Sequence, residues 1–188
     1  RDDVESRGLG DVYKRQFDWF YRKKNNLSLQ EVSSFEIEPV KKFALQGWKL
    51  GNIHGLSHWQ RVERNGLLLA TSKVNITVVR LFAYLHDKCR IDNDRDIQHG
   101  VRATKMLCEI RHSLLKDITE DEFYMLSKAC ELHTTTLKTG NITIDTCFDA
   151  DRLDLERVDI IPDPNRMATT KGKYWAKHLD KFHQIALG

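Results

Sequence analysis

The sequence LFAYLHDKCR, residues 81–90, places a histidine and an aspartate directly after an apolar run. His86 and Asp87 offer an imidazole nitrogen and a carboxylate oxygen, two ligand types that borderline divalent metals bind readily. Such side chains are costly to bury unless they are paired or bind a metal. The pair is therefore a candidate for metal ligation, provided that further ligands reach it from other segments.

Further histidines and aspartates stand where they could join this pair. His54 and His58 lie four residues apart in HGLSHWQRV and share one helical face if a helix begins that early. His99 opens a later segment of helical periodicity, and His133 closes another. The segment DADRLD adds three aspartates, Asp149, Asp151 and Asp154.

Helices must position these side chains, because helical periodicity dominates the chain. The best strand signal, NITIDTCF at 141–148, runs into a helical stretch. The three prolines stand at 39, 162 and 164, so no proline interrupts a helix between residues 40 and 161. The periodicity predicts helices over 57–72, 74–87, 94–115, 119–133, 146–158 and 172–187, with a loop over 160–172. The predicted fold class is all-α, a bundle of six or more helices.

Two of these helices carry recognisable start signals. Asp94 and Asp96 are capping-type residues at the beginning of the helix expected over 94–115. Thr119 is followed by an acidic first turn, which is typical of a helix N-terminus.

The composition narrows the class of protein. The 188 residues suffice for one domain with a core, and 40% hydrophobic with 30% charged residues is ordinary for a globular protein. A net charge of +3 is too mild to indicate a nucleic-acid partner. No apolar run approaches the roughly 18 residues of a membrane span, so no membrane partner is expected. The four cysteines lie far apart without a CxxC pair, which predicts reduced thiols and a cytoplasmic location.

The first sixteen residues, RDDVESRGLGDVYKRQ, are polar and lack helical periodicity. They resemble translated adapter sequence, so residues 1–16 are expected to be a non-native leader, with a genuine disordered N-terminus as the alternative. Residues 17–188 are expected to form a single domain.

The segments HGLSHWQRV, FAYLHDKCR and CFDADRLD, in that order, resemble the HD-domain superfamily of metal-dependent phosphohydrolases. The resemblance covers roughly residues 52–158. It implies an all-α HD-type core in which a histidine, a His–Asp doublet and a distal aspartate bind a metal. Carried onto this chain, the metal ligands are His58, His86, Asp87 and Asp151.

Some members of this superfamily hold two metals through two further histidines, and His99 and His133 are placed for that role. The interval from Asp87 to His99 is shorter than in many two-metal members. The alternative interpretation is that His99 lies in solvent at a helix start and that His133 complements a helix dipole. The resemblance therefore leaves open whether one or two ions bind.

The residues after the doublet depart from several branches of the superfamily. Arg90 occupies the position of a lysine in the cyclic-dinucleotide phosphodiesterase branch and could bind a phosphate through two hydrogen bonds. No acidic residue follows Asp87, which argues against the branch that cleaves alarmones and makes Asp87 itself the simplest general base. His54, Arg61 and Arg152 are candidate substrate-binding residues. For His54, the alternatives are a contact behind the metal ligands or a helix-capping or core role. For the two arginines, an ordinary ion pair is the alternative.

Three functions remain open from the sequence. The leading hypothesis is hydrolysis of a small-molecule phosphoester or nucleotide by water activated on a divalent Mn, Fe, Co, Ni, Zn or Mg ion. The second is a diiron oxygenase that cleaves a carbon–carbon or carbon–phosphorus bond. The third is a non-catalytic regulatory module with a structural metal, although structural sites tend to be closed. The sequence also leaves a homo-oligomer open.

Overall fold

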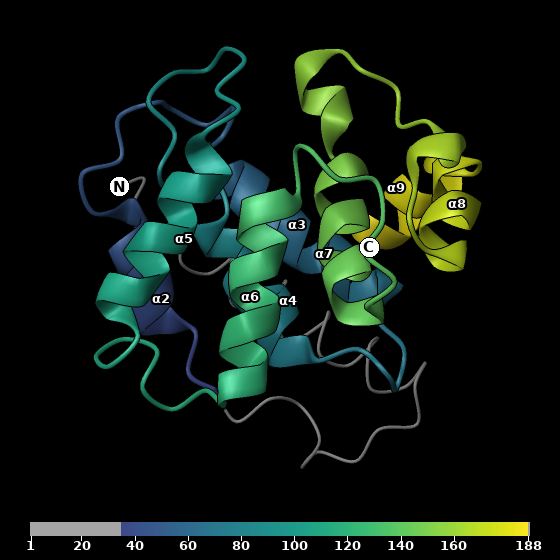
Figure 1. Cartoon of the computed structure of the whole chain (residues 1–188). Helices are drawn as coiled ribbons and strands as arrows, with labels where there is room; N and C mark the ends of the chain where they lie inside the picture. The colour runs from purple at the N-terminus through teal and green to yellow at the C-terminus, as the bar shows by residue number, and fades with distance from the viewer. Residues whose placement is uncertain (1–34, 188) are drawn as a thin grey trace, which may run out of the picture. The chain divides into compact units, whose positions relative to one another are not determined.

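The computed structural model describes residues 35–187, which belong to one compact unit (Figure 1). The predicted leader, residues 1–16, lies outside the described residues. Within them the chain forms α-helices, two 3-10 helices and no strand, which confirms the all-α prediction. The α-helices are α2 (Glu38–Leu45), α3 (Leu56–Leu69), α4 (Ile76–Leu85), α5 (His99–Ile110), α6 (Glu120–Leu132), α7 (Ile142–Arg152), α8 (Thr170–Ala176) and α9 (Leu179–Leu187). The 3-10 helices are η1 (Leu155–Val158) and η2 (Pro164–Arg166).

The helices predicted over 57–72, 74–87 and 119–133 are confirmed as α3, α4 and α6. Asn75 begins α4 by accepting a hydrogen bond from the backbone N–H of Val78. Thr119 begins α6 in a capping box, in which its hydroxyl and the Glu122 carboxylate each bind the other residue's backbone N–H. Polar side chains at these starts thus replace missing helical hydrogen bonds.

Three segments differ from the prediction. The strand signal at 141–148 is the beginning of α7, because the Asn141 side chain accepts two backbone N–H groups and starts a helix there. The helix expected over 172–187 is divided into α8 and α9, since α8 ends at Ala176. Asp94 and Asp96 do not cap α5, which starts only at His99, because Asp96 instead binds the backbone N–H of Ile91 and the Arg102 side chain.

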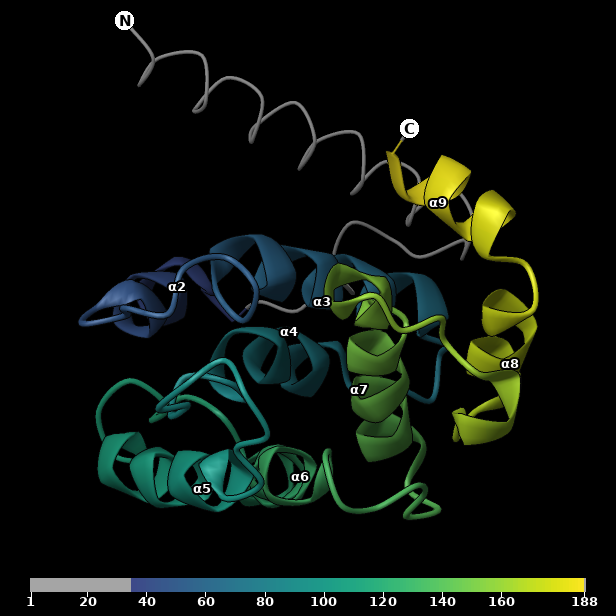
Figure 2. The ribbon, with the colours of Figure 1, turned by 90° about the horizontal axis from the view of Figure 1, so that it is seen from above.

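The helices pack in layers around α4. Figure 2 shows α4 between α3 on one side and the α5–α6 pair on the other, with α7 alongside. Helix α4 contacts α3, α6 and α7, and α5 contacts α6. The side chains of α4 that face them, including Phe82, Tyr84 and Leu85, are fully buried. No described helix is long and apolar enough to cross a membrane.

Two glycines allow helices to approach closely. A methyl group on Gly66 would collide with the Val79 side chain, so α3 and α4 need a glycine at their crossing. A methyl group on Gly100 would collide with the backbone carbonyl of Cys130, so α5 can lie against α6 only with a glycine there. Because Gly100 follows His99, this contact also sets how near that histidine comes to α6.

Candidate metal centre

The C-terminal end of α4 delivers the His–Asp doublet. His86 is the first residue after the helix, and its imidazole Nδ1 lies 3.0 Å from the carbonyl oxygen of Phe82 one turn earlier. The imidazole also stacks on the Phe82 ring, with 4.7 Å between ring centroids. The apolar run before the doublet therefore fixes the orientation of His86 as well as burying the helix.

A first ligand group forms where α3 and α7 meet this end of α4. It consists of the four residues that the HD resemblance selected, His58, His86, Asp87 and Asp151. The Nε2 atom of His58 lies 3.2 Å from His86 Nε2, 3.4 Å from Asp151 Oδ1 and 3.5 Å from Asp87 Oδ2. Ligand atoms of His58, His86 and Asp87 all lie within 4.8 Å of one another, and those of Asp151, His86 and His133 do so as well. Side chains from three helices thus meet at this end of α4, as a metal site requires.

A second ligand group shares Asp87 and adds His99 and His133 from α5 and α6. His99 Nε2 lies 3.0 Å from Asp87 Oδ1 and 2.8 Å from His133 Nε2, which is 3.9 Å from the same carboxylate oxygen. Both histidines are buried, so the interpretation of His99 as a solvent-exposed helix residue is wrong. The two oxygens of Asp87 thus face different groups, Oδ2 the first and Oδ1 the second.

The Nδ1 atoms of the four imidazoles, which point away from the two ligand groups, show that the donor set fits a metal. Each Nδ1 lies within hydrogen-bond distance of an acceptor: His58 of Asp154 Oδ2 at 2.7 Å, His86 of the Phe82 carbonyl, His99 of the Asp96 carbonyl and His133 of the Cys130 carbonyl. His99 Nδ1 also lies 3.3 Å from Arg90 Nη1, but the Asp96 carbonyl is its nearer partner. In a neutral ring the proton then resides on Nδ1 and the Nε2 lone pair points inward. Within each group, two such lone pairs face each other.

Facing lone pairs cannot hydrogen-bond to each other, so they repel unless a cation lies between them. The Oδ1 atom of Asp151 is buried and has no hydrogen-bond partner among the described residues. Buried polar atoms are almost always satisfied, which makes this oxygen an available ligand. A divalent ion in each group would resolve both conflicts.

The protonation behaviour of His86 and His133 agrees with this arrangement. Burial lowers the pKa of His86 to about 3 and also lowers that of His133, which keeps both rings neutral and able to ligate. Burial alone would raise the pKa of Asp87 and Asp151, but the surrounding histidines, and Arg157 beside Asp151, lower both instead. The pKa of His58 is raised, because hydrogen bonds to Asp154 and Asp87 outweigh the effect of burial.

A pocket of about 290 Å³ opens onto the two ligand groups. Asp87, His99, His133 and Asp151 line it, whereas His58 and His86 do not. The segment between α4 and α5 and the segment with η1 stand at the same end of the bundle, at the top of Figure 1, and both contribute to the lining. A small molecule could therefore reach ligand atoms of both groups.

Of the four candidate substrate-binding residues, two line the pocket and two do not. Arg90 and His54 line the pocket, and His54 Nδ1 lies 3.0 Å from Asp87 Oδ2. Arg61 binds Asp154 instead, through contacts of 2.5 and 3.0 Å, and so forms the ion pair that was its alternative role. Arg152 binds the backbone carbonyls of Thr136, Leu137 and Arg166, and it does not line the pocket.

Three features of the site were missed by the sequence reasoning. Arg157 lines the pocket beside Asp151, and Asp154 orients His58 rather than binding at the centre. Asp149, the first aspartate of DADRLD, accepts hydrogen bonds from the backbone N–H groups of Ala168 and Thr169, so its role is structural. The spacing of Asp151 and Asp154, three residues apart, was the available signal that they share a helical face.

No protein-family profile, curated protein or solved structure matches this chain.

Proposed function

We propose that this protein is a metal-dependent phosphohydrolase of the HD type that uses two divalent ions. The observation that carries the proposal is Asp87, whose two carboxylate oxygens face separate histidine pairs at the floor of an open pocket. Sites with an accessible floor are typical of catalytic metals, and closed sites of structural ones. The arginines beside the pocket add affinity for an anionic substrate.

Divalent ions bound to the two groups would supply Lewis acidity for phosphate oxygens and lower the pKa of an attacking water. His58, His86 and Asp151 would hold one ion, His99 and His133 the other, and Asp87 would contact both. Asp87 would then be unavailable as a free base, so its role shifts from the predicted general base to positioning the two ions. Arg90 would bind the phosphate of a small-molecule ester or nucleotide at the pocket wall.

The test is hydrolysis of chromogenic phosphoesters and a nucleotide panel by protein loaded with Mn, Fe, Co, Ni, Zn or Mg. We expect turnover with at least one ion, and its loss in His86→Ala, whose folding is checked by circular dichroism. Silence of the folded, fully loaded protein across the panel would remove the hydrolase proposal.

The four-histidine donor set also favours a second candidate, a diiron oxygenase. Histidine and carboxylate ligands suit iron, and the His, His–Asp, His, His, Asp order is present. Protein loaded with iron under anaerobic conditions should then show a mixed-valent EPR signal and consume oxygen with its substrate. One metal ion per chain by elemental analysis would exclude this candidate.

We also expect the protein to act in the cytoplasm as an enzyme of small molecules. The four cysteines are all free thiols, two of them buried. A reducing compartment keeps such thiols in this state. Measuring metal content and activity with and without a reductant tests this expectation. Loss of activity on oxidation that a reductant restores supports a reducing compartment, and a disulfide-linked form with full activity would oppose it.

A further inference from the structure

Arg90 and Arg157 occupy equivalent places on the two sides of the pocket. Arg90 Nη1 lies 3.6 Å from Asp87 Oδ1, and Arg157 Nη2 lies 3.6 Å from Asp151 Oδ1. Both side chains line the pocket and are almost buried, at 8% and 9% exposed. Each guanidinium thus approaches a carboxylate of the candidate metal centre from the side of the pocket.

Backbone carbonyls hold both arginines in these positions. Arg90 donates from Nε to the carbonyl of Asp92 at 3.3 Å and from Nη2 to that of Asp94 at 2.6 Å. Arg157 donates from Nε to the carbonyl of Ile53 at 3.0 Å and from Nη1 to that of Asp154 at 2.9 Å. The nitrogen that is left faces the centre in both cases. Arg90 Nη1 lies 3.3 Å from His99 Nδ1 and 3.6 Å from the Asp87 carboxylate, and Arg157 Nη2 lies 3.6 Å from the Asp151 carboxylate.

The two arginines come from segments that are far apart in the sequence. Arg90 follows the doublet by three residues, and Arg157 lies in η1, six residues after Asp151. Arg90 therefore lies beside Asp87, and Arg157 lies beside Asp151. A guanidinium held rigidly loses little conformational freedom when it binds an anion, so both arms are ready before a substrate arrives.

We infer that Arg90 and Arg157 form a two-armed clamp for a terminal phosphate, so that the substrate is a phosphomonoester rather than a phosphodiester. This inference rests on the proposed phosphohydrolase function. A monoester phosphate near neutral pH carries close to two negative charges and three free oxygens, which can meet both guanidinium groups and the metal centre at once. A diester carries one charge and two free oxygens, so it engages fewer of these donors at once, and its second ester arm must extend out of the mouth of a pocket of about 290 Å³, at the small end for ligand sites.

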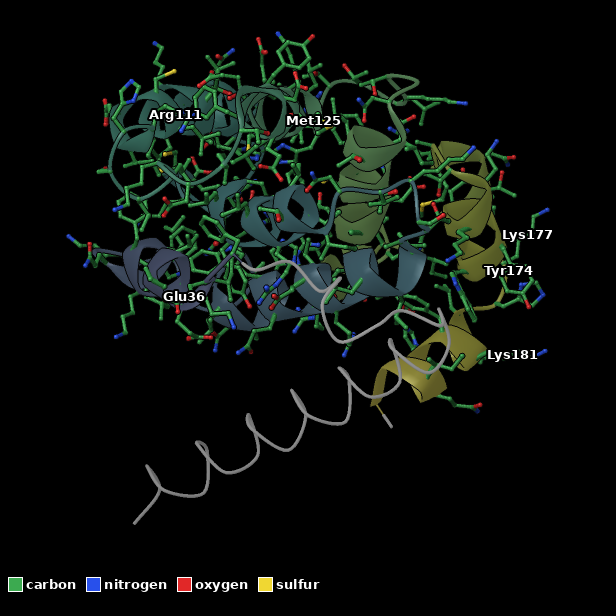
Figure 3. All side chains as sticks on the ribbon, turned by 90° about the horizontal axis from the view of Figure 1, so that it is seen from below. Glu36, Arg111, Met125, Tyr174, Lys177 and Lys181 are labelled. Atoms are coloured by element: carbon green, nitrogen blue, oxygen red, sulfur yellow. The ribbon has the colours of Figure 1, made fainter. Side chains whose placement is uncertain are left out.

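The experiment measures binding of inorganic phosphate to manganese-loaded and metal-free protein by calorimetry, with no need for turnover. We expect Arg157→Lys and Arg90→Lys each to weaken phosphate binding by about tenfold, because lysine keeps the charge but loses the rigid fork. The matched control is Arg111→Lys. Arg111 also binds two backbone carbonyls, of Leu115 and Ile118, but lies at the periphery of the domain (Figure 3). This control should bind phosphate as the wild type does.

The same preparation is then assayed with 4-nitrophenyl phosphate and, separately, with bis(4-nitrophenyl) phosphate, and the two initial-rate values of kcat/KM are compared. We expect a preference of about tenfold or more for the monoester. A preference for the diester overturns the monoester assignment, and unchanged phosphate binding in both lysine variants overturns the clamp. If neither ester is cleaved but phosphate binding still depends on the two arginines, the clamp stands and the hydrolase proposal fails. The comparison of the two esters uses only the wild-type protein. It therefore tests the assignment of a phosphomonoester substrate even if a lysine variant does not fold.

Discussion

The two ligand groups of the centre share Asp87 but are supported in different ways. In the first group, His58 donates its Nδ1 proton to the carboxylate of Asp154, which is in turn held by Arg61. In the second group, the corresponding protons of His99 and His133 go to the backbone carbonyls of Asp96 and Cys130. A carboxylate partner makes an imidazole a stronger ligand than a carbonyl does.

The first group therefore differs from the second in what determines its affinity for an ion: the strength of its ligands in the first, and their position in the second. The first group is built from charged side chains and should bind its ion more tightly. The second group depends on the distance between α5 and α6, which Gly100 keeps short. We therefore expect the second ion to be the one that is lost first on dialysis against a chelator.

Asp87→Ala should have the largest effect, because it removes the one residue that both groups share. We expect the metal content to fall from two ions per chain to fewer than one and phosphoester hydrolysis to reach background. Elemental analysis with a parallel activity assay checks this. Retention of two ions in the folded variant would show that the carboxylate is not shared.

Gly100→Ala should remove the second ion alone. The added methyl group meets the Cys130 carbonyl, so α5 must move away from α6 and carry His99 away from His133. We expect one ion per chain in the folded variant. Gly66→Ala is the comparison, because its methyl group meets the Val79 side chain between α3 and α4, which carry His58 and the His86–Asp87 doublet, and it should weaken the first ion while His99 and His133 stay in place. Equal loss of the second ion in both variants would contradict the placement argument.

Asp154→Ala should weaken the first ion without removing it. Loss of a carboxylate behind a metal-binding histidine typically costs about 10–100-fold in affinity, and we expect that range for the tighter ion. Asp154→Asn keeps an acceptor for His58 Nδ1 and should recover part of the loss. Competition with a fluorescent chelator measures both constants. A larger effect on the weaker ion would reverse the assignment of the two groups.

Thr119→Ala should have the smallest effect and leave the metals untouched. It removes the capping box of α6 and should lower the free energy of unfolding by about 1 kcal/mol, as measured by urea denaturation. The metal content should stay at two ions. This variant therefore separates general destabilisation from the specific losses above, and a loss of metal here would mean that any weakening of α6 suffices.

Local patterns predicted the helices and the candidate ligands that they carry. The apolar run of α4 and the capping box at Thr119 act within a few residues, so their outcome can be foreseen from the sequence. His58, His86 and Asp151 follow from an ordered set of motifs, and the structure brings them together.

The features that sequence reasoning missed depend on contacts between distant segments. Arg157 reaches the pocket because a 3-10 turn after α7 carries it to the carbonyl of Ile53, which no local pattern encodes. Arg152 carries the same charge but binds carbonyls around residues 136–137 and 166 instead. The Asn141 cap likewise outweighed a partial strand alternation. Charge and periodicity in the sequence identify candidate residues. Tertiary packing determines which of these residues line the pocket.

The most direct test of the two-ion centre is anomalous diffraction from crystals grown with manganese. We predict two anomalous peaks, one on either side of Asp87, the first contacted by His58, His86 and Asp151 and the second by His99 and His133. A single peak that leaves His99 and His133 uncoordinated, or no peak at this end of the bundle, would contradict the account.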